Sequence, residues 1–545
     1  MPDRHTDVLI VGGGLGGVAA AIAAVQGGAR VILIEGDRWL GGQLTAQAVP
    51  PDEHPWSEQF GITASYRALR NGIRRYYRTH YPLTHAARST PHLNPGGGLV
   101  SPLCHEPRVA KAVIDEMLAP LRGSGRLEVL QPYRAVAVET AGDEVRSVTV
   151  TSDLRGIRAN ECGTEATVTI SASYVIDATE LGDLLPLAQV EYVTGFESRR
   201  TTGEPSAPEE AQPLNMQAVS WCFALEHVDG DHTIDRPRTY DYWRAARPDM
   251  WPGPLLGFSW PDPRTLEAAH GWLSPNPEDD PLSVVADQSK NPGTLDLWRF
   301  RRIAARRLFE PGIYASDITI INWPMIDYLE GPVFEVPDAE AAAHRQGARE
   351  LSRSALYWMQ TEAPRPDGGT GFPGLRLRPD VMGTDDGLAQ DLYVRESRRI
   401  LALETVTEND ISLAVRGDAG ATSYSDSVGI GMYRIDLHPS TGGDTYIDVA
   451  STPFQIPLGA LLPVRVRNLL PACKNIGTTH ITNGAYRLHP VEWNVGEAAG
   501  ALAAFSCATG EPPQAVREKA DLLSDFQALL SRRGVELAWP NVRAY

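Results

Sequence analysis

Residues 8–17 read VLIVGGGLGG, an aliphatic run that leads directly into a cluster of glycines. The run contains no charged residue, so a hydropathy window could mistake it for a membrane span. A signal peptide is disfavoured, because acidic residues precede the run and glycines interrupt it. The next segment, ARVILIE at residues 29–35, is a second strand-like run that ends at Glu35. This order of strand, glycine turn, helix, strand and acid predicts a buried parallel βαβ unit.

The glycine turn has the spacing G-x-G-x-x-G, formed by Gly12, Gly14 and Gly17, and it precedes an Ala-rich helix expected over residues 18–26. Such glycines permit a tight turn, close approach of the backbone to a pyrophosphate, and close packing of helix on strand. The helix N-terminus presents unpaired N–H groups to the phosphates. Glu35 follows Gly17 by 18 residues, where an acid can accept hydrogen bonds from a ribose. The pattern therefore predicts a dinucleotide-binding site.

Length and composition limit the class of protein. At 545 residues the chain is too long for one simple core, and two interleaved domains are expected. The net charge of −18, from 50 basic and 68 acidic residues, disfavours nucleic acid and membrane as partners. The five cysteines are odd in number and widely spaced, so we expect reduced thiols in a cytoplasmic protein. No zinc-ligand spacing occurs, and the sequence predicts no metal site.

Two further glycine patterns are assigned to structure alone. GTGFPG at residues 369–374 repeats the dinucleotide spacing, but it lies among prolines and follows no strand, so a loop is predicted. A second dinucleotide unit, and with it a built-in NAD(P)H domain, is therefore not expected. Gly496 and Gly500 form G-x-x-x-G in a helix that also carries Glu492 and Glu497. These charges favour close helix packing within the protein over dimerisation in a membrane.

Several separated segments carry a family resemblance. They are VLIVGGGLGG (8–17), VILIEGDRWLGGQLT (31–45), CHEPRV (104–109), YVIDATELGDLLPLAQVEYVTG (174–195), YVRESRRI (393–400), YRIDLHP (433–439) and NLLPACKNIGTTHITNGAYRLHPVEWNVGEAAGALA (468–503). Together they resemble the FAD-dependent oxidoreductases of the glutathione reductase/fumarate reductase superfamily, and the last segment is the most specific. The resemblance implies FAD as the cofactor.

The resemblance also implies the architecture, an α/β fold in which a Rossmann-type FAD-binding domain carries an inserted mixed α+β substrate lobe. A polar, Pro-rich stretch after Val193 marks the first boundary. The expected division is residues 1–195 for the N-terminal part of the FAD-binding domain, 196–454 for the substrate lobe, 455–510 for the C-terminal part of the FAD-binding domain, and 511–545 for a C-terminal helical tail. Near residues 516–531 we expect one last amphipathic helix.

The resemblance implies a cofactor-binding set from several segments. Its members are Gly12, Gly14, Gly16, Gly17, Glu35, Gly42, Gln43, Thr45, Ala178, Thr179, Asn483 and Glu492. The glycine turn would meet the pyrophosphate, Glu35 the adenosine ribose, and the loop beginning at Gly42 the phosphates and isoalloxazine. Two positions depart from the family pattern. Glu180 stands where a glycine is common, and Cys473–Lys474 stands where many relatives have Ala-Gly-Arg-like residues.

The C-terminal segment also has a physical interpretation. Pro490 suits the first turn of a helix, and the loop before it contains Arg487 and His489. A helix N-terminus and an arginine near the flavin pyrimidine edge would stabilise the negative charge of reduced flavin. The alternative is that Arg487 pairs with a surface acid.

Flavin oxidation of a C–H bond beside O–H or N–H usually also needs a base for the proton of the heteroatom. His480 and His489 flank the predicted flavin loop and are the first candidates, with Arg487 supporting charge and His105 as the next candidate base. His438 is a further histidine of the set, and helix capping or structural hydrogen bonding is the alternative role for each. For Cys104 we expect a buried, inert thiol.

The sequence therefore predicts a dehydrogenase or oxidase that acts on a small-molecule polar substrate, with oxygen or a separate electron carrier reoxidising FAD. The alternative is a flavin-dependent non-redox isomerase or lyase. A homo-oligomer is possible for either. Aromatic residues crowd the middle region, from Tyr240 to Trp260, and could stack on a substrate, although a core role is expected for most of them.

Overall fold

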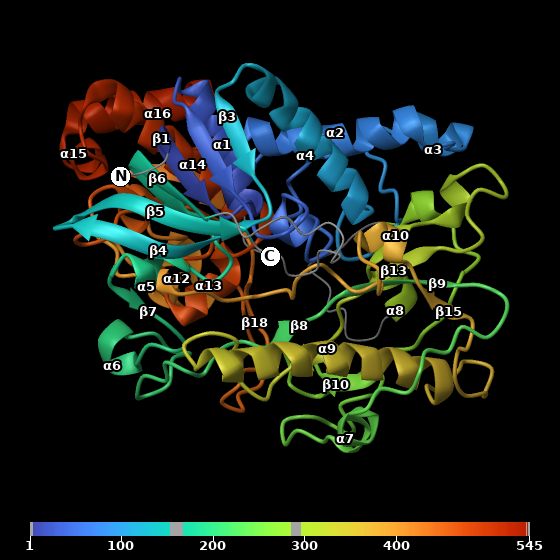
Figure 1. Ribbon diagram of the computed structural model, residues 1–545. Coiled ribbons are helices and arrows are strands. Elements are labelled where there is room, and N and C mark those ends of the chain that lie inside the picture. The colour runs from blue at the N-terminus through green and yellow to red at the C-terminus, as the bar shows by residue number, and fades with distance from the viewer. Residues whose placement is uncertain (1–3, 153–166, 285–295, 541, 543–545) are drawn as a thin grey trace.

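The computed structural model describes residues 4–152, 167–284, 296–540 and 542, so Cys162 lies outside the described residues. Its largest sheet has the order β3-β2-β1-β6-β5-β4, with β21 paired to β6. The strands are β1 (Arg4–Val11), β2 (Val31–Ile34), β3 (Leu127–Leu130), β4 (Tyr133–Ala141), β5 (Glu144–Ser152), β6 (Thr167–Asp177) and β21 (Leu469–Pro471). Figure 1 shows this sheet beside the helices of both ends of the chain.

The centre of the sheet is parallel. Val8 of β1 pairs with Val31 of β2 on one side and with Tyr174 of β6 on the other. Leu469 of β21 pairs in parallel with Val175, so the C-terminal segment completes this sheet. β4 and β5 form an antiparallel hairpin, and β5 then pairs with the first residues of β6. The Val- and Ile-rich runs are buried because helices cover both faces of a parallel sheet.

Two helices pack closely on the sheet, α1 (Leu15–Gln26) and α14 (His489–Thr509). A Cβ atom at Gly496 would lie 2.0 Å from the carbonyl oxygen of Gly16, and one at Gly500 would lie 2.1 Å from that of Ala20. Both glycines are therefore required by the contact between α1 and α14. The expected close helix packing is confirmed.

The remaining helices of this domain differ from the sequence prediction at one place. α2 (Ala64–His80) packs on α4 (Pro107–Gly123), which has a proline in its first turn. The single amphipathic helix expected near residues 516–531 is instead two helices, α15 (Pro513–Glu518) and α16 (Ala520–Arg532). The break falls at Lys519, whose φ of −94° and ψ of 114° are extended rather than helical. Propensity alone gives no signal for this change of direction.

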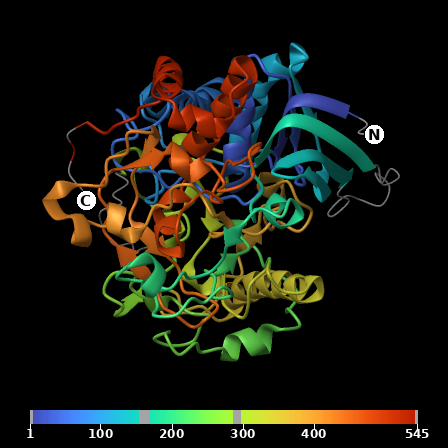
Figure 2. The same cartoon turned by 90° about the vertical axis from the view of Figure 1, so that its left-hand side faces the viewer.

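The segment between β6 and β21 is rich in loops. Its four-stranded antiparallel sheet has the order β12-β13-β9-β15, formed by β9 (Phe223–His227), β12 (Arg302–Ala304), β13 (Ile318–Ile321) and β15 (Leu375–Leu377). The long helix α9 (Asp338–Thr361) lies at the end of the molecule opposite α1 and α14, and Figure 2 agrees. Trp243, Trp251 and Trp260 are buried, whereas Tyr242 is 58% exposed. A core role for most of the aromatics is thus confirmed, and residues 369–374 form a loop.

The other elements of the segment are short. They are α5 (Leu184–Leu187), β7 (Tyr192–Val193), α6 (Arg199–Thr202), β8 (Val219–Ser220), α7 (Tyr240–Ala245), β10 (Ser259–Pro261), β11 (Ala268–His270), α8 (Leu297–Phe300), β14 (Asp327–Tyr328), α10 (Pro379–Met382), β16 (Arg399–Ile400), α11 (Glu408–Ile411), α12 (Leu413–Arg416), β17 (Ser427–Gly431), β18 (Ile435–Leu437), β19 (Ile447–Val449) and β20 (Phe454–Pro457). Outside it lie α3 (His85–Ser89) and α13 (His480–Tyr486).

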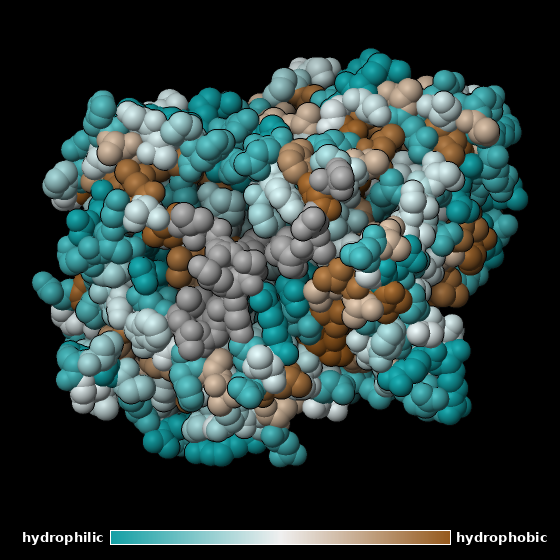
Figure 3. Space-filling model, turned by 180° about the vertical axis from the view of Figure 1, so that it is seen from behind, coloured by the Kyte–Doolittle hydropathy of each residue, from teal (hydrophilic) through white to brown (hydrophobic). Residues whose placement is uncertain are grey.

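The surface is mostly hydrophilic on the face shown in Figure 3, where apolar residues form separate groups. Within the described part of the chain, no helix is both long enough and apolar enough to cross a membrane. The same residues contain no group of three or more histidine, cysteine or carboxylate side chains arranged for a metal ion.

Candidate active site

The glycine turn lies between the end of β1 and the start of α1. Gly12 has a φ of +102°, and a Cβ there would lie 2.1 Å from the carbonyl oxygen of Ala178. A Cβ at Gly17 would lie 1.9 Å from the carbonyl oxygen of Gly12, so both positions need glycine for packing. Gly14 differs, because its Cβ would approach only side-chain ends, the nearest being a carboxylate oxygen of Glu180 at 3.0 Å. Gly14 therefore faces the space in front of the helix N-terminus, where a phosphate fits.

Glu35 follows β2 and faces the glycine turn. Its carboxylate accepts hydrogen bonds from the backbone N–H groups of Gly13 and Asp37. Burial raises the pKa of Glu35 to about 7. An acid held at this place, one strand away from the turn, fits the hydroxyls of an adenosine ribose.

The two departures from the family pattern contact each other. The Lys474 ammonium pairs with the Glu180 carboxylate, which lies against Gly14 and Gly42. The Lys474 side chain is fully buried, and although burial lowers its pKa, Glu180 and Glu492 raise it above the usual value. An anion and a cation therefore stand beside the N-terminus of α1. The cation is of the kind that binds a diphosphate.

The loop after Gly42 is tied to the start of α14. Gln43 donates from Nε2 to the Glu492 carboxylate and to the carbonyl oxygen of Arg487, the latter at 3.0 Å. The other oxygen of Glu492 accepts from the N–H of Gly16 at 3.3 Å. Burial raises the pKa of Glu492 to about 7. The predicted residues Gln43 and Glu492 are thus brought together with the glycine turn.

Three other predicted cofactor residues make hydrogen bonds within the protein. Thr45 donates from Oγ1 to the carbonyl oxygen of Leu40 at 2.8 Å. Thr179, beside Ala178 at the end of β6, donates to the Asp177 carboxylate from its N–H and its hydroxyl. The amide of Asn483 donates to the carbonyl oxygen of Lys474 at 3.1 Å, and its buried Oδ1 has no hydrogen-bond partner among the described residues.

His489 is the first residue of α14 and is fully buried. Its Nδ1 accepts the backbone N–H of Asp52 at 3.0 Å, so in the neutral ring the proton is on Nε2. Burial lowers the pKa of His489 to about 3, which keeps the ring neutral. No residue that the structure describes hydrogen bonds to Nε2 within normal geometry, although the carbonyl of Val49 lies near the ring. His489 therefore presents a hydrogen-bond donor.

His105 has the opposite arrangement. Its Nδ1 lies 3.0 Å from the carbonyl oxygen of Glu106, so Nδ1 carries the proton and donates it. Nε2 then holds a lone pair, and it is buried without a partner in the described part of the chain. Burial lowers the pKa of His105 to about 4, and the ring is close enough to His489 to lower that residue's pKa. His105 therefore presents a hydrogen-bond acceptor.

His480 lies in a different polar cluster. Its Nδ1 is 3.0 Å from the Glu396 carboxylate, and its ring stacks on Phe196 at 3.7 Å between centroids. Arg399 joins the same carboxylate at 3.0 Å. Burial would raise the pKa of Glu396, but His480 and Arg399 lower it to about 2. This ion cluster gives His480 a structural reason for its burial.

Arg487 ends α13 and is 3% exposed. It donates to the hydroxyl of Tyr393 at 2.7 Å and to the carbonyl oxygen of Asp436 at 3.0 Å. Its nearest carboxylate oxygen, on Asp436, is 3.5 Å away. Arg487 is itself buried, but Asp436 is partly exposed, so the alternative of a pairing with an acid near the surface also has a contact in the structure.

Asp52 had no signal in the sequence analysis, and for His438, which was a candidate there, the sequence did not indicate its partners. Asp52 lies in the loop after Gly42, where residues 46–54 are all buried. Burial raises the pKa of Asp52, although Arg301 and Arg487 both lower it. His438 carries an imidazole that is 2.6 Å from the Asp327 carboxylate, with Arg395 on the other oxygen at 3.0 Å. The one hint in the sequence was the run of three polar residues, Asp52, Glu53 and His54, after two prolines.

Cys104 is buried, as expected. Burial raises the pKa of Cys104 to about 12. Cys104, Cys222, Cys473 and Cys507 are free cysteines.

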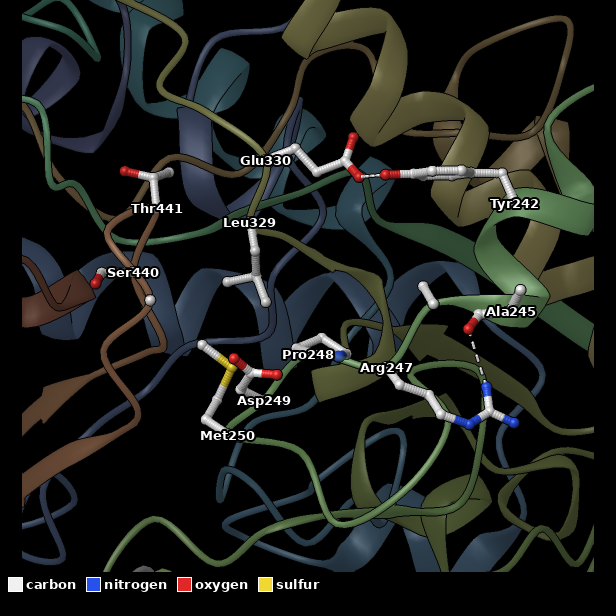
Figure 4. Close-up of a pocket in the computed structure, with 12 residues that line it drawn as sticks. Tyr242, Ala245, Arg247, Pro248, Asp249, Met250, Leu329, Glu330, Ser440 and Thr441 are labelled. Atoms are coloured by element: carbon white, nitrogen blue, oxygen red, sulfur yellow. Dashed lines mark hydrogen bonds between the residues drawn. The ribbon is translucent and has the colours of Figure 1, made fainter.

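A separate pocket of about 520 Å³ opens on the inserted segment, and Figure 4 shows its lining. Tyr242 of α7 and the loop to Met250 form one side, and Leu329 and Ser440 form the other. The Tyr242 hydroxyl donates to Glu330. This pocket contains none of the predicted cofactor or catalytic residues.

The comparison with protein families assigns the chain. The model of the family described as FAD dependent oxidoreductase matches residues 7–530, and the chain belongs to this family. It is therefore an FAD-dependent oxidoreductase, and the residues around the glycine turn fit the cofactor. No curated protein sequence matches the chain.

The solved structures that match the chain have low sequence identity to it. OxyS anhydrotetracycline hydroxylase from Streptomyces rimosus is 12% identical, with a TM-score of 0.32, over 97% of this chain and 66% of that one. A geranylgeranyl bacteriochlorophyll reductase-like protein from Thermoplasma acidophilum is 11% identical, with a TM-score of 0.31, over 98% and 84%. The flavin-dependent monooxygenase PieE is 13% identical, with a TM-score of 0.29, over 74% and 52%. The chain spans just under two thirds of the length of the hydroxylase.

Proposed function

We propose that the protein is a dehydrogenase or oxidase that removes a hydride from a small polar organic substrate. When bound, FAD supplies the hydride acceptor at N5 of its flavin. The observation that carries the proposal is the pair of neighbouring buried imidazoles, His105 and His489, each with an Nε2 atom that has no hydrogen-bond partner among the described residues. The Nε2 atom of His480 also has no partner there, but that ring is held in another cluster by Glu396 and Phe196. Unpaired buried polar atoms are costly, and a bound polar substrate would satisfy them.

The two imidazoles have complementary roles. The His105 Nε2 lone pair can accept the proton of a substrate hydroxyl or amine, and the His489 Nε2–H can donate to the same heteroatom. Loss of that proton favours removal of hydride from the adjacent carbon. His105 is therefore the proposed base, and His489 the proposed orienting donor. The cluster around His480 is proposed to support the fold of the site.

Arg487 is proposed to stabilise negative charge at the pyrimidine edge of the flavin. Its backbone carbonyl is tied to Gln43 of the cofactor loop, and it lies two residues before His489 at the N-terminus of α14. A buried guanidinium beside a helix N-terminus is a strong electrostatic partner for an anion.

The electron acceptor is proposed to be oxygen or a separate carrier, because the sequence contains one dinucleotide unit. A flavin-dependent isomerase or lyase is the second candidate, and the same two imidazoles would suit its proton transfers.

Anaerobic mixing of the yellow protein with small alcohols, amines, hydroxy acids and amino acids tests the proposal. A true substrate should bleach the flavin absorbance, and His105→Ala should slow that bleaching while FAD stays bound. Conversion of a compound to product without bleaching would instead support an isomerase or lyase.

A further inference from the structure

The Lys474 ammonium has one hydrogen-bond partner among the described residues. Lys474 follows β21, and its side chain is fully buried. It pairs with the Glu180 carboxylate, and because an ammonium has three donors, the others stay free among those residues. A buried ion pair is favourable only where its remaining donors are satisfied as well, so Lys474 can bind a second anion.

Glu180 places this ion pair at the phosphate end of the cofactor site. One oxygen of its carboxylate is bound to Lys474. The other oxygen lies 3.0 Å from the position of a Cβ at Gly14 and 2.8 Å from that of a Cβ at Gly42. Gly14 is the N-cap of α1, where the helix N-terminus favours an anion. Glu180 therefore stands between the ammonium and the place where the diphosphate fits.

A second carboxylate lies at the same place, but the protein holds it differently. Glu492 accepts from the N–H of Gly16 at 3.3 Å and from the amide of Gln43, and one of its oxygens lies 3.5 Å from the position of a Cβ at Gly14. The Glu180 carboxylate, in contrast, accepts a hydrogen bond from Lys474 alone within the described part of the chain. Glu180 is thus the carboxylate with fewer bonds to lose.

We infer that Lys474 is a ligand of the FAD diphosphate and that Glu180 competes with the diphosphate for the Lys474 ammonium. In flavin-free protein the Glu180 carboxylate neutralises the buried ammonium. In FAD-loaded protein the diphosphate takes over this role, and Glu180, whose side chain is 25% exposed, can turn toward solvent. A carboxylate that stays beside the diphosphate repels it, because like charges a few ångströms apart interact strongly away from water.

Titration of flavin-free protein with FAD, followed by flavin fluorescence, tests both roles. Lys474→Met should weaken FAD by about tenfold or more, as loss of a charged hydrogen bond does, and Lys474→Arg should weaken it less. Glu180→Gln should tighten FAD by about fivefold or more, because it removes the competing charge and keeps the shape of the side chain. Lys519→Met and Glu511→Gln are the matched controls, since this pair is exposed and should leave the affinity unchanged.

Competition with ADP separates the diphosphate from the flavin. ADP carries the same diphosphate as FAD but no isoalloxazine, so Lys474→Met should weaken ADP and FAD by the same factor. A loss of FAD affinity with unchanged ADP affinity would place Lys474 at the flavin and would overturn the inference.

Thermal unfolding of the flavin-free variants gives a second readout. Glu180→Gln should melt below the parent, because it leaves a buried ammonium without its anion, and yet it should bind FAD more tightly. A purely structural role of Glu180 would not produce this combination. Where Lys474→Met does not fold, the double variant Lys474→Met/Glu180→Gln removes both charges, and it should bind FAD about tenfold more weakly than Glu180→Gln alone.

The remaining outcomes are also decisive. The inference fails if Glu180→Gln binds FAD no more tightly than the parent, or if the double variant and Glu180→Gln bind FAD equally well. Every measurement is made without substrate, so these outcomes are independent of the proposed reaction.

Discussion

At the residue scale, the site depends on which ring nitrogen of each histidine carries the proton. His489 accepts from a backbone N–H, and His105 donates to a backbone carbonyl, so their free nitrogens have opposite hydrogen-bonding character. The sequence placed both histidines among the candidates. His489 came before His105 as the candidate base in the sequence analysis, and the proposal reverses this order. The hydrogen bond from Asp52 to His489, on which the reversal depends, joins residues 437 positions apart and leaves no local signal.

His105→Ala should reduce the rate of anaerobic flavin reduction by about 10²–10⁴-fold, the usual cost of losing a positioned base. FAD content should stay at the parent level. Because the pKa of His105 is lowered to about 4, titration of this group should not change the parent rate of flavin reduction between pH 6 and 9. His480→Ala serves as the comparison. If His480→Ala lost as much rate at full FAD content, the result would contradict His105 as the base and indicate His480, in the Glu396 cluster. Stopped-flow absorbance provides the rates.

Stability should depend on pH through Glu492. Its pKa is raised by burial from 4.5 to about 7, so the uncharged form is favoured in the folded protein. A group with a raised pKa contributes stability below the unfolded value, and that stability is lost as the pH rises through the folded value. Flavin-free protein should therefore melt at a lower temperature as the pH rises from 5 to 8, and Glu492→Gln should flatten the dependence. Glu116→Gln, at a carboxylate that is 58% exposed, should keep the parent slope.

At the scale of the element, the glycine turn was predictable and its environment was not. Local spacing predicted the turn, α1 and the acid after β2, since these depend on neighbours in sequence. The pair of Glu180 and Lys474 joins residues 294 positions apart, and no local pattern indicates it. No local pattern indicates the break between α15 and α16 at Lys519 either, since the apolar periodicity predicted one continuous helix.

Gly14→Trp should give a folded, colourless protein. A side chain at Gly14 would approach only the ends of Glu180 and Glu492, so the backbone can keep its course while the indole fills the phosphate space. Retention of one FAD per chain in this variant would show that the cradle lies elsewhere. Absorbance at 450 nm against protein concentration measures the occupancy.

Gly496→Leu should destabilise the protein by at least about 2 kcal/mol, as overpacking in a close contact does. Its Cβ would lie 2.0 Å from the carbonyl oxygen of Gly16, and neither helix backbone can yield without moving the glycine turn. Urea unfolding measures the change. A variant with parent stability would contradict the packing of α14 on α1.

At the scale of the whole molecule, the two ends of the chain build one sheet. β21 pairs in parallel with β6, although Leu469 and Val175 are far apart in sequence. The α/β class and the Rossmann-type domain could be predicted, because the opening βαβ unit and α14 each have strong sequence patterns. The loop-rich segment between them could not, since its strands are short and its buried polar residues follow no period. Asp52 lies outside that segment, in the buried loop after Gly42, and the sequence did not indicate its burial either.

The central claim is that the segment around Arg487 and the N-terminus of α14 faces the flavin. Potentiometric titration of parent and Arg487→Ala, both loaded with FAD, tests it most directly. The account predicts a lower flavin midpoint potential in Arg487→Ala, by about 30 mV or more, which is about 1.4 kcal/mol for a two-electron couple. An unchanged potential at full FAD occupancy would contradict it.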